Sequence, residues 1–350
     1  MDYDLFTLTE VLKVQKRPLV FWLEKFFPRE IRSDDDKIAF DRVSEDYRRK
    51  APFVAPNVQG KVLKSEGYDT IAFKPAYVKP KHIIDINDVI VRRPGEQPGG
   101  ELTQQQRHDA VVANLLERHK AMHTMTQEWM AARAVIDGKV TVEGEGYPKV
   151  TVDFRRDANL TSLLVGGAVW AVDGTTGNPL NDIAEMRRTS SELCGARVND
   201  LIFGQGAYQR FLANPAVKEL LNTQVRGSDS NFTKLADAYG DSIEYLGMLT
   251  GPQAQFTVKL WLYTGKIRND SDVLENILDT NTIVGVDGPM LEGFRCFGAI
   301  KDGKAGFQSL EMFPKVWEDQ DPWQEYLMTQ SAPLMVPKQP NASFSIKCAP

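Results

Sequence analysis

The chain lacks any hydrophobic run long enough to cross a membrane. A spanning helix needs about 18 to 20 apolar residues in succession, and no stretch of the 350 residues approaches that length. The first four residues, Met1-Asp2-Tyr3-Asp4, are acidic, whereas a secretory signal begins with basic and then apolar residues. We therefore expect the protein to remain in the cytoplasm in which it is made.

Cysteine and histidine are scarce. The three cysteines are an odd number at wide spacing, which argues against both a disulfide framework and a zinc site. His119 and His123 lie four residues apart and would share one helix face, but Lys120 stands where a zinc-protease motif needs glutamate. We interpret the histidines as surface or subunit-contact residues, and we expect no metal and no cofactor. The cysteines are Cys194, Cys296 and Cys348.

Common catalytic motifs are also missing. The chain contains no GxxxxGK[ST] phosphate loop and no GxSxG elbow. Gly204 and Gly206 follow a predicted strand and open a predicted helix, which is the context of a dinucleotide-binding turn, but Gln209 stands where glycine or alanine is usual. We predict that the chain is not an enzyme, and an α/β nucleotide-binding enzyme is the alternative of a different class.

A surplus of positive charge is missing as well. Lys and Arg number 42 against 47 Asp and Glu, so the net charge is −5 at pH 7. Dedicated nucleic-acid binders gain affinity from Lys and Arg that neutralise phosphates, so the balance argues against that class. A weakly acidic surface suits a container that surrounds nucleic acid without sequence-specific binding.

Residues 53–94 have the pattern of an extended arm. Apolar and polar residues alternate from 58 to 93 with the period of two that is typical of strands. A two-stranded ribbon is marginally stable by itself in water, so its apolar residues need a partner surface, which a neighbouring copy would supply. The predicted inter-subunit contacts are Val62, Ile71, Phe73, Tyr77, Lys79, Lys81 and Ile84 in the arm, with Trp22 and Phe26 in the aromatic-rich segment before it.

The basic residues of the arm allow two interpretations. Lys79 and Lys81 beside Tyr77 could contact phosphates and stack on a base. We favour pairing with an acidic patch on the next subunit, because the isoleucines and valines interspersed among the lysines need burial.

After the arm, the hydrophobic period changes from two to that of a helix. Residues 101–136 contain no Pro or Gly, and their apolar residues recur at steps of three and four, which predicts one helix on the order of 50 Å long. A hairpin follows over 139–154, then a mixed α/β region over 179–288 and further strands, with the end of the chain expected to complete the sheet beside the long helix. The other predicted helices are 8–15, 183–194, 207–222 and 231–239, and the other strands are 197–203, 243–249, 256–263, 294–300, 326–336 and 344–347.

Several short motifs carry a family resemblance. They are Tyr77-Val78-Lys79-Pro80-Lys81-His82, Gln330-Ser331-Ala332-Pro333-Leu334-Met335, Arg226-Gly227-Ser228-Asp229-Ser230, Phe313-Pro314-Lys315 with Trp317, and Gly293-Phe294-Arg295. With these landmarks in order over nearly its whole length, the chain resembles the lambda-type major capsid proteins of tailed bacteriophages, the capsid protein E family.

The resemblance implies an α+β fold, the tailed-phage capsid fold named after phage Hong Kong 97. It implies an N-terminal arm (1–52), an extended loop (53–97), a peripheral domain with the spine helix (98–178), an inserted axial domain (179–287) and a return to the peripheral domain (288–350). A non-viral protein compartment of the same fold is an alternative.

The resemblance also implies the partners and the location. Copies are expected to form hexamers and pentamers in an icosahedral virion shell, which assembles in the host cytoplasm as a procapsid and expands around double-stranded DNA. A portal and a decoration protein are expected partners. Because the chain begins directly with the arm, a separate scaffolding protein is expected too.

Overall fold

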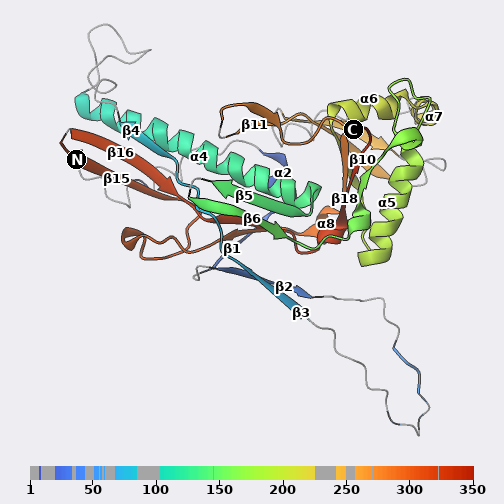
Figure 1. Ribbon diagram of the computed structural model, residues 1–350, viewed down its shortest axis with the longest axis horizontal. Helices are drawn as coiled ribbons and strands as arrows, with labels where there is room; N and C mark the ends of the chain where they lie inside the picture. Colours follow the sequence, from blue (N-terminus) through green and yellow to red (C-terminus); the bar gives the residue numbers. More distant parts are fainter. Residues whose placement is uncertain are drawn as a thin grey trace.

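The longest element, helix α4, runs along the body of the computed structural model, and a narrow ribbon of two strands projects from the body (Figure 1). The structure describes residues 8, 20–33, 37–43, 51–54, 56, 59, 68–84, 103–144, 146–224, 242–249, 257–269, 271–321 and 323–350, with the backbone alone at 41–43, 68–71 and 220–224. Val62, the segment 226–230 and the predicted helices over 8–15 (apart from Leu8) and 231–239 lie outside these residues.

Helix α4 spans Gln104–Ile136 and confirms the predicted long helix. Its 33 residues correspond to about 50 Å at 1.5 Å per residue. Thr103 and Gln106 form a capping box at its start: the Gln106 amide donates to Thr103 Oγ1 (3.2 Å), and the Thr103 amide donates to Gln106 Oε1 (2.9 Å). At the other end, the half-buried Arg156 side chain donates to the carbonyls of Val135 (2.8 Å) and Ile136 (2.7 Å).

A six-stranded mixed sheet in the order β7-β18-β13-β8-β10-β9 forms one end of the body. Its strands alternate between two cores: Leu201 and Phe203 of β8 pack with α5 and α6, whereas Ile202 lies in the core shared with α2 and α4. Because both faces are covered, all four side chains of β8 are buried. The bounds are Thr161–Leu163 (β7), Ser343–Lys347 (β18), Thr282–Val286 (β13), Asp200–Phe203 (β8), Val258–Tyr263 (β10), Ile243–Leu249 (β9), Pro179–Cys194 (α5) and Gln205–Ala213 (α6).

The last strand, β18, belongs to this sheet. It pairs with β13 and β7, although the sequence places 344–347 beyond the predicted boundary at 288. The same strand also touches the spine helix, because Ser343 Oγ donates to the carbonyl of Val135 (3.1 Å). The end of the chain therefore connects the sheet of the predicted axial region to the spine helix of the predicted peripheral region.

Two three-stranded sheets complete the body. One has the order β1-β14-β17 and the other β15-β16-β4. The single strand predicted over 326–336 is wrong, since Ser331 and Ala332 separate β16 from β17 where the chain passes from one sheet to the other. The bounds are Arg29–Arg32 (β1), Phe294–Phe297 (β14), Pro333–Val336 (β17), Phe313–Gln320 (β15), Trp323–Gln330 (β16) and Lys81–Ile84 (β4).

The predicted helix over 207–222 is two helices. Pro215 has no amide hydrogen to continue α6, and it becomes the first residue of α7. The Asn214 side chain accepts a hydrogen bond from the Ala216 amide (3.0 Å) at this break. The remaining elements are α7 (Pro215–Gln224), α8 (Gly288–Leu291), β11 (Lys266–Arg268), β12 (Leu274–Asn276), and the short 3-10 helices Ala158–Leu160, Gly166–Ala168, Gly303–Ala305 and Pro340–Ala342.

The projecting ribbon consists of β2 (Ile38–Val43) and β3 (Tyr68–Phe73), paired antiparallel from Ile38 opposite Phe73 to Val43 opposite Tyr68. The arm's strand β3 therefore has its partner in the segment expected to be the N-terminal arm. A second hairpin, β5 (Lys139–Gly144) with β6 (Tyr147–Asp153), follows α4 and confirms the prediction.

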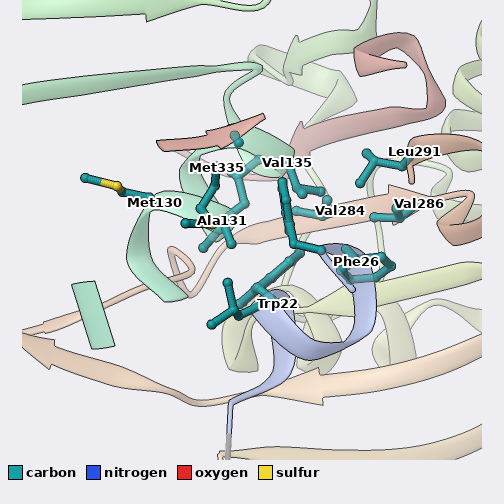
Figure 2. Close-up of a cluster of buried hydrophobic side chains, with 14 of the residues drawn as sticks. Trp22, Phe26, Met130, Ala131, Val135, Val284, Val286, Leu291 and Met335 are labelled. Carbon is teal, nitrogen blue, oxygen red and sulfur yellow. The ribbon is translucent and has the colours of Figure 1, made fainter. Parts of the chain in front are cut away.

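The largest core gathers residues from distant parts of the chain. Figure 2 shows Trp22 and Phe26 of α2 (Phe21–Phe26) beside Val135 of α4 and Val284 of β13. Both aromatic side chains are 0% exposed. The aromatic cluster of the N-terminal segment thus packs against its own chain.

Candidate functional site

The base of the arm is fastened to the body as an edge strand. Strand β4 pairs antiparallel with β16, from Lys81 opposite Met328 to Ile84 opposite Glu325. Just before it, the Val78 amide donates to the Ser331 carbonyl (2.8 Å) and the Ser331 amide donates back to Val78 (3.0 Å). The two resemblance motifs, residues 77–82 and 330–335, are therefore in direct contact.

The side chains of the arm base contact rings and carbonyls of the same chain. Tyr77 Oη donates to the Ala299 carbonyl (2.8 Å), and Lys79 Nζ lies 4.8 Å from the Tyr77 ring centroid. Lys81 Nζ lies 3.7 Å from the centroid of Tyr326, a cation–π distance. Because Lys79 and Lys81 remain exposed, both can still meet a neighbouring molecule.

Three predicted inter-subunit residues are buried inside their own chain, so the prediction needs correction there. Ile84 is 2% exposed in a cluster with Val112 and Leu327. Trp22 and Phe26 are 0% exposed, and in this conformation they present no surface to a partner. Apolar alternation shows that a residue is buried, but it cannot show whether its own chain or another one buries it.

The other predicted contacts lie on or beside the ribbon. Ile71 pairs with Phe40 within the ribbon. Phe73 is half-buried at the base of the ribbon and packs against the largest core. Ile83 of β4 was not among the predicted contacts, and its side chain is 54% exposed on the edge strand.

Helix α2 is held by a glutamate of α4 that sequence reasoning also missed. Glu128 Oε1 accepts the amides of Phe21 and Trp22 (3.0 Å each), and Oε2 accepts the amide of Leu23 (2.8 Å). Tyr263 Oη donates to the same carboxylate (3.3 Å). These are the first three amides of α2, which no residue within a helix can satisfy. The sequence did contain a signal for this role. Glu128 lies three residues before Ala131 and seven before Val135, which is the spacing of one helix face, and both of those residues are buried.

Burial raises the pKa of the Glu128 carboxyl above its usual value, and the hydrogen bonds from the α2 amides and Tyr263 oppose that rise. Next to it, Lys25 Nζ lies 2.6 Å from Asp200 Oδ1, which also accepts the indole N–H of Trp261 (2.7 Å). Burial lowers the pKa of Lys25 to about 8, against the attraction of Asp200. Polar contacts therefore anchor α2 deep in the body.

The histidines are not the surface residues that the sequence suggested. His119 is 0% exposed and His123 is 2% exposed. Both hydrogen-bond to Thr329 of β16, at 3.1 Å and 2.9 Å. Among the described residues, no group of three or more His, Cys, Asp or Glu side chains is placed to hold a metal ion.

The turn at Gly204, on which the nucleotide-binding alternative depends, is closely packed by its own chain. A Cβ at Gly204 would lie 2.4 Å from the Asp279 carbonyl oxygen, and one at Gly206 would lie 2.6 Å from Asn281 Oδ1. The Ala207 amide donates to the Thr280 carbonyl (2.8 Å). The chain's own backbone therefore fills the place at the start of α6 where a pyrophosphate would bind.

Two further sequence predictions concern cysteines and membranes. All three cysteines are free thiols, and burial raises the pKa of Cys296 to about 12 and that of Cys348 to about 11.

Within the described part of the chain, no helix combines the length and the apolar character needed to span a bilayer.

Comparison with known proteins gives matches along nearly the whole chain. The family model described as phage major capsid protein E matches residues 4–348. The major capsid proteins of Escherichia phage N15 and Escherichia phage lambda are 30% and 29% identical over 354 residues, covering 99% of this chain and 100% of each relative.

Solved structures agree with these sequence matches. The crystal structure of a putative capsid protein of a prophage of E. coli CFT073 has a TM-score of 0.74 and 25% identity, with 99% of both chains covered. The mature capsid of bacteriophage PhiM1 has a TM-score of 0.50 at 13% identity over 94% of this chain and 86% of that one, which supports the fold alone.

Proposed function

The chain belongs to the phage major capsid protein E family and has the Hong Kong 97-type fold, and from this premise we propose that copies of it assemble into the icosahedral head shell of a lambda-like phage. Its relatives are structural proteins of the capsid rather than enzymes. The protein accordingly acts by regulated self-association and has its place in the virion.

One observation carries the proposal: the family match includes the projecting ribbon. The base of the ribbon packs on the body, with the ring centroid of Phe40 5.9 Å from that of Phe154, and strand pairing continues outward to Val43 and Tyr68. A two-stranded ribbon needs a further surface for stability, and a neighbouring copy supplies it by adding strands and covering the apolar face. Several such neighbours would bury more than the roughly 1,600 Å² of a standard interface.

The shell has hexamers and pentamers as its capsomers. It forms around a separate scaffolding protein in the host cytoplasm, carries a portal and a decoration protein, and expands from a procapsid as double-stranded DNA enters. The net charge of −5 supports enclosure of DNA without sequence-specific binding. Expansion needs two subunit packings of similar free energy, and the arm and the spine helix are the elements that change between them.

The subunit is divided as its relatives' fold suggests: an N-terminal arm (1–52), an extended loop (53–97), a peripheral domain (98–178 and 288–350) and an axial domain (179–287). Contacts between copies are made by Val62, Ile71 and Phe73 in the ribbon region. Tyr77, Lys79 and Lys81 contribute at the arm base, with the exposed Ile83 beside them.

Electron microscopy of negatively stained particles tests the proposal. The full chain, produced with its scaffolding protein, should form closed shells. A variant in which a short Gly-Asn turn replaces residues 44–67 keeps β2, β3 and the buried Ile84, so it should remain folded by circular dichroism and form no shells. Normal shells from that variant would contradict the role of the ribbon, and a chain that stays monomeric at high concentration with its scaffold would contradict assembly.

A further inference from the structure

All four histidines of the chain lie in one seam, between α4 and the sheet β15-β16-β4. His108, His119 and His123 come from α4, and His82 comes from β4. Strand β16 turns Glu325, Leu327 and Thr329 toward the helix, as alternate residues of a strand do. The seam thus has a polar contact at each end and an apolar centre formed by Leu327 with Ile84, Val112 and Leu116.

At one end, a chain of hydrogen bonds links three histidines through a hydroxyl. His82 Nδ1 lies 2.6 Å from His119 Nε2, His119 Nδ1 lies 3.1 Å from Thr329 Oγ1, and Thr329 Oγ1 lies 2.9 Å from His123 Nε2. We call His82, His119, Thr329 and His123 the histidine relay. It ties the arm base (β4) to the spine helix (α4) across β16.

Every hydrogen bond of the relay has one donor and one acceptor when each imidazole carries a single proton. His123 Nδ1 is buried without a hydrogen-bond partner, so its proton belongs on Nε2, which donates to Thr329 Oγ1. Thr329 then donates to His119 Nδ1, and His119 Nε2 donates to His82 Nδ1. A second proton on His119 would face the Thr329 hydroxyl hydrogen, and one on His82 Nδ1 would face the His119 N–H.

Among the residues that the structure describes, the acidic side chains nearest the relay have other partners. In the part of the chain that the structure describes, no carboxylate forms an ion pair with His82, His119 or His123. Glu325 of β16 pairs with His108 (2.5 Å), Glu128 of α4 holds the α2 amides, and Lys81 of β4 lies over the ring of Tyr326.

Burial and the neighbouring histidine both favour the neutral ring. Burial, with His82 as the second cause, lowers the pKa of His119 from 6.5 to about 4; burial, with His119 second, lowers the pKa of His123 to about 4. An open seam would let both rings titrate near 6.5. The closed seam therefore loses stability as the pH falls from about 6.5 toward 4, since only the open form readily takes up protons.

We propose that the histidine relay is a proton-operated latch, closed while the rings of His119 and His123 are neutral and opened by acid, which releases β4 and the arm base from the spine helix. The latch is a property of the single chain and does not rest on the proposed assembly. Acid release would let the arm change its direction while the six-stranded sheet stays intact.

Hydrogen–deuterium exchange of the full-length subunit at pH 7.5 and pH 5.0 tests the latch. After correction for the intrinsic rate, peptides covering β4 and β16 should exchange at least about tenfold faster at pH 5.0, because protonation of His119 and of His123 each favours the open form by up to about tenfold per pH unit below 6.5. Peptides covering β8 and β13 should keep their rates and serve as the internal control. Equal protection of β4 at both pH values would overturn the proposal.

Variants separate the relay from general acid sensitivity. The double variant His119→Gln, His123→Gln replaces the two buried rings with polar side chains that cannot titrate, and its β4 exchange should depend on pH much less than that of the unaltered chain. A pH response of normal size in this variant would contradict the latch. Should the variant fail to fold, titration of the ring protons of the unaltered chain by NMR decides: midpoints below pH 5 for His119 and His123 are expected, and midpoints near 6.5 would overturn the proposal.

Discussion

Two neighbouring segments of the spine helix bind their partners through opposite kinds of polar contact. Toward its C-terminal half, Glu128 brings a buried carboxylate to three amides of α2. Near the middle of the helix, five and nine residues before Glu128, His123 and His119 bring neutral rings to Thr329. The first contact satisfies a helix end that needs an acceptor, whereas the second depends on every group staying uncharged.

The two contacts should therefore respond to acid in opposite directions. The pKa of Glu128 is raised by burial, so its contribution to stability is fully present in acid and is lost as the pH rises through its raised value. The pKa values of His119 and His123 are lowered to about 4, so their contribution is present at neutral pH and is lost as the pH falls below 6.5. Acid would loosen the arm base and leave α2 docked.

The largest expected effect concerns the apolar part of the α2 contact. Trp22→Ala should lower the free energy of unfolding by about 4 kcal/mol, because a large side chain with no exposed surface leaves a cavity. Trp129→Ala on α4 is the matched control: that ring is half-buried, and its loss should cost about 2 kcal/mol. Urea denaturation measures both, and equal values would mean that α2 is not docked as described.

Glu128→Ala should come next. The substitution leaves three buried amides and the Tyr263 hydroxyl without their acceptor, which should cost about 3 kcal/mol at pH 7. Glu128→Gln keeps the shape and one acceptor oxygen, so its cost should be about half as large. Denaturation curves at pH 7 provide the measurement, and a Glu128→Ala chain as stable as the original would show that water satisfies these amides.

Thr329→Val tests the contact of α4 at His119 and His123. The new side chain has the same shape but no hydroxyl, which leaves His119 Nδ1 and the His123 N–H unpaired and should cost about 2 kcal/mol at pH 7.5. Thr329→Ser keeps the hydroxyl and should restore most of the loss. If Thr329→Ser lowers the free energy of unfolding in denaturant and Thr329→Val does not, the methyl group and not the hydrogen bonds supports the seam.

The smallest effect is expected at the exposed arm base. Lys81→Ala removes a cation over the Tyr326 ring at a solvent-exposed position, where such contacts are worth about 0.5 kcal/mol. The melting temperature of the isolated subunit should change by no more than about 2 °C. A larger drop would mean that Lys81 supports the subunit itself rather than remaining available to a neighbour.

Local patterns predicted the spine helix, the hairpin after it and strand β9 well. The helix lies within 104–136 of the predicted 101–136, since an apolar stripe without Pro or Gly leaves few alternatives. The partner of β3 could not be predicted in the same way, because 38–43 lies about 30 residues away and register between distant strands leaves no local signal.

The candidate site was harder to predict than the fold. The sequence shows that Trp22, Phe26 and Ile84 need burial, but the identity of the covering surface is a property of the whole tertiary structure. Glu128 and the histidines look like ordinary polar residues of a charged helix until α2 and β16 are placed against them. Buried polar contacts are made by partners far apart in sequence, and composition does not reveal them.

Chemical crosslinking of a shell built from equal amounts of ordinary and nitrogen-15-labelled chains tests the central claim most directly. Mixed-isotope peptides reveal links between different copies. We predict that Lys74, Lys79 and Lys81 at the base of the arm form such mixed links in assembled particles and lose them when the particles are dissociated. Links from these lysines that join only residues of the same copy would contradict the account, because the arm would then serve its own subunit alone.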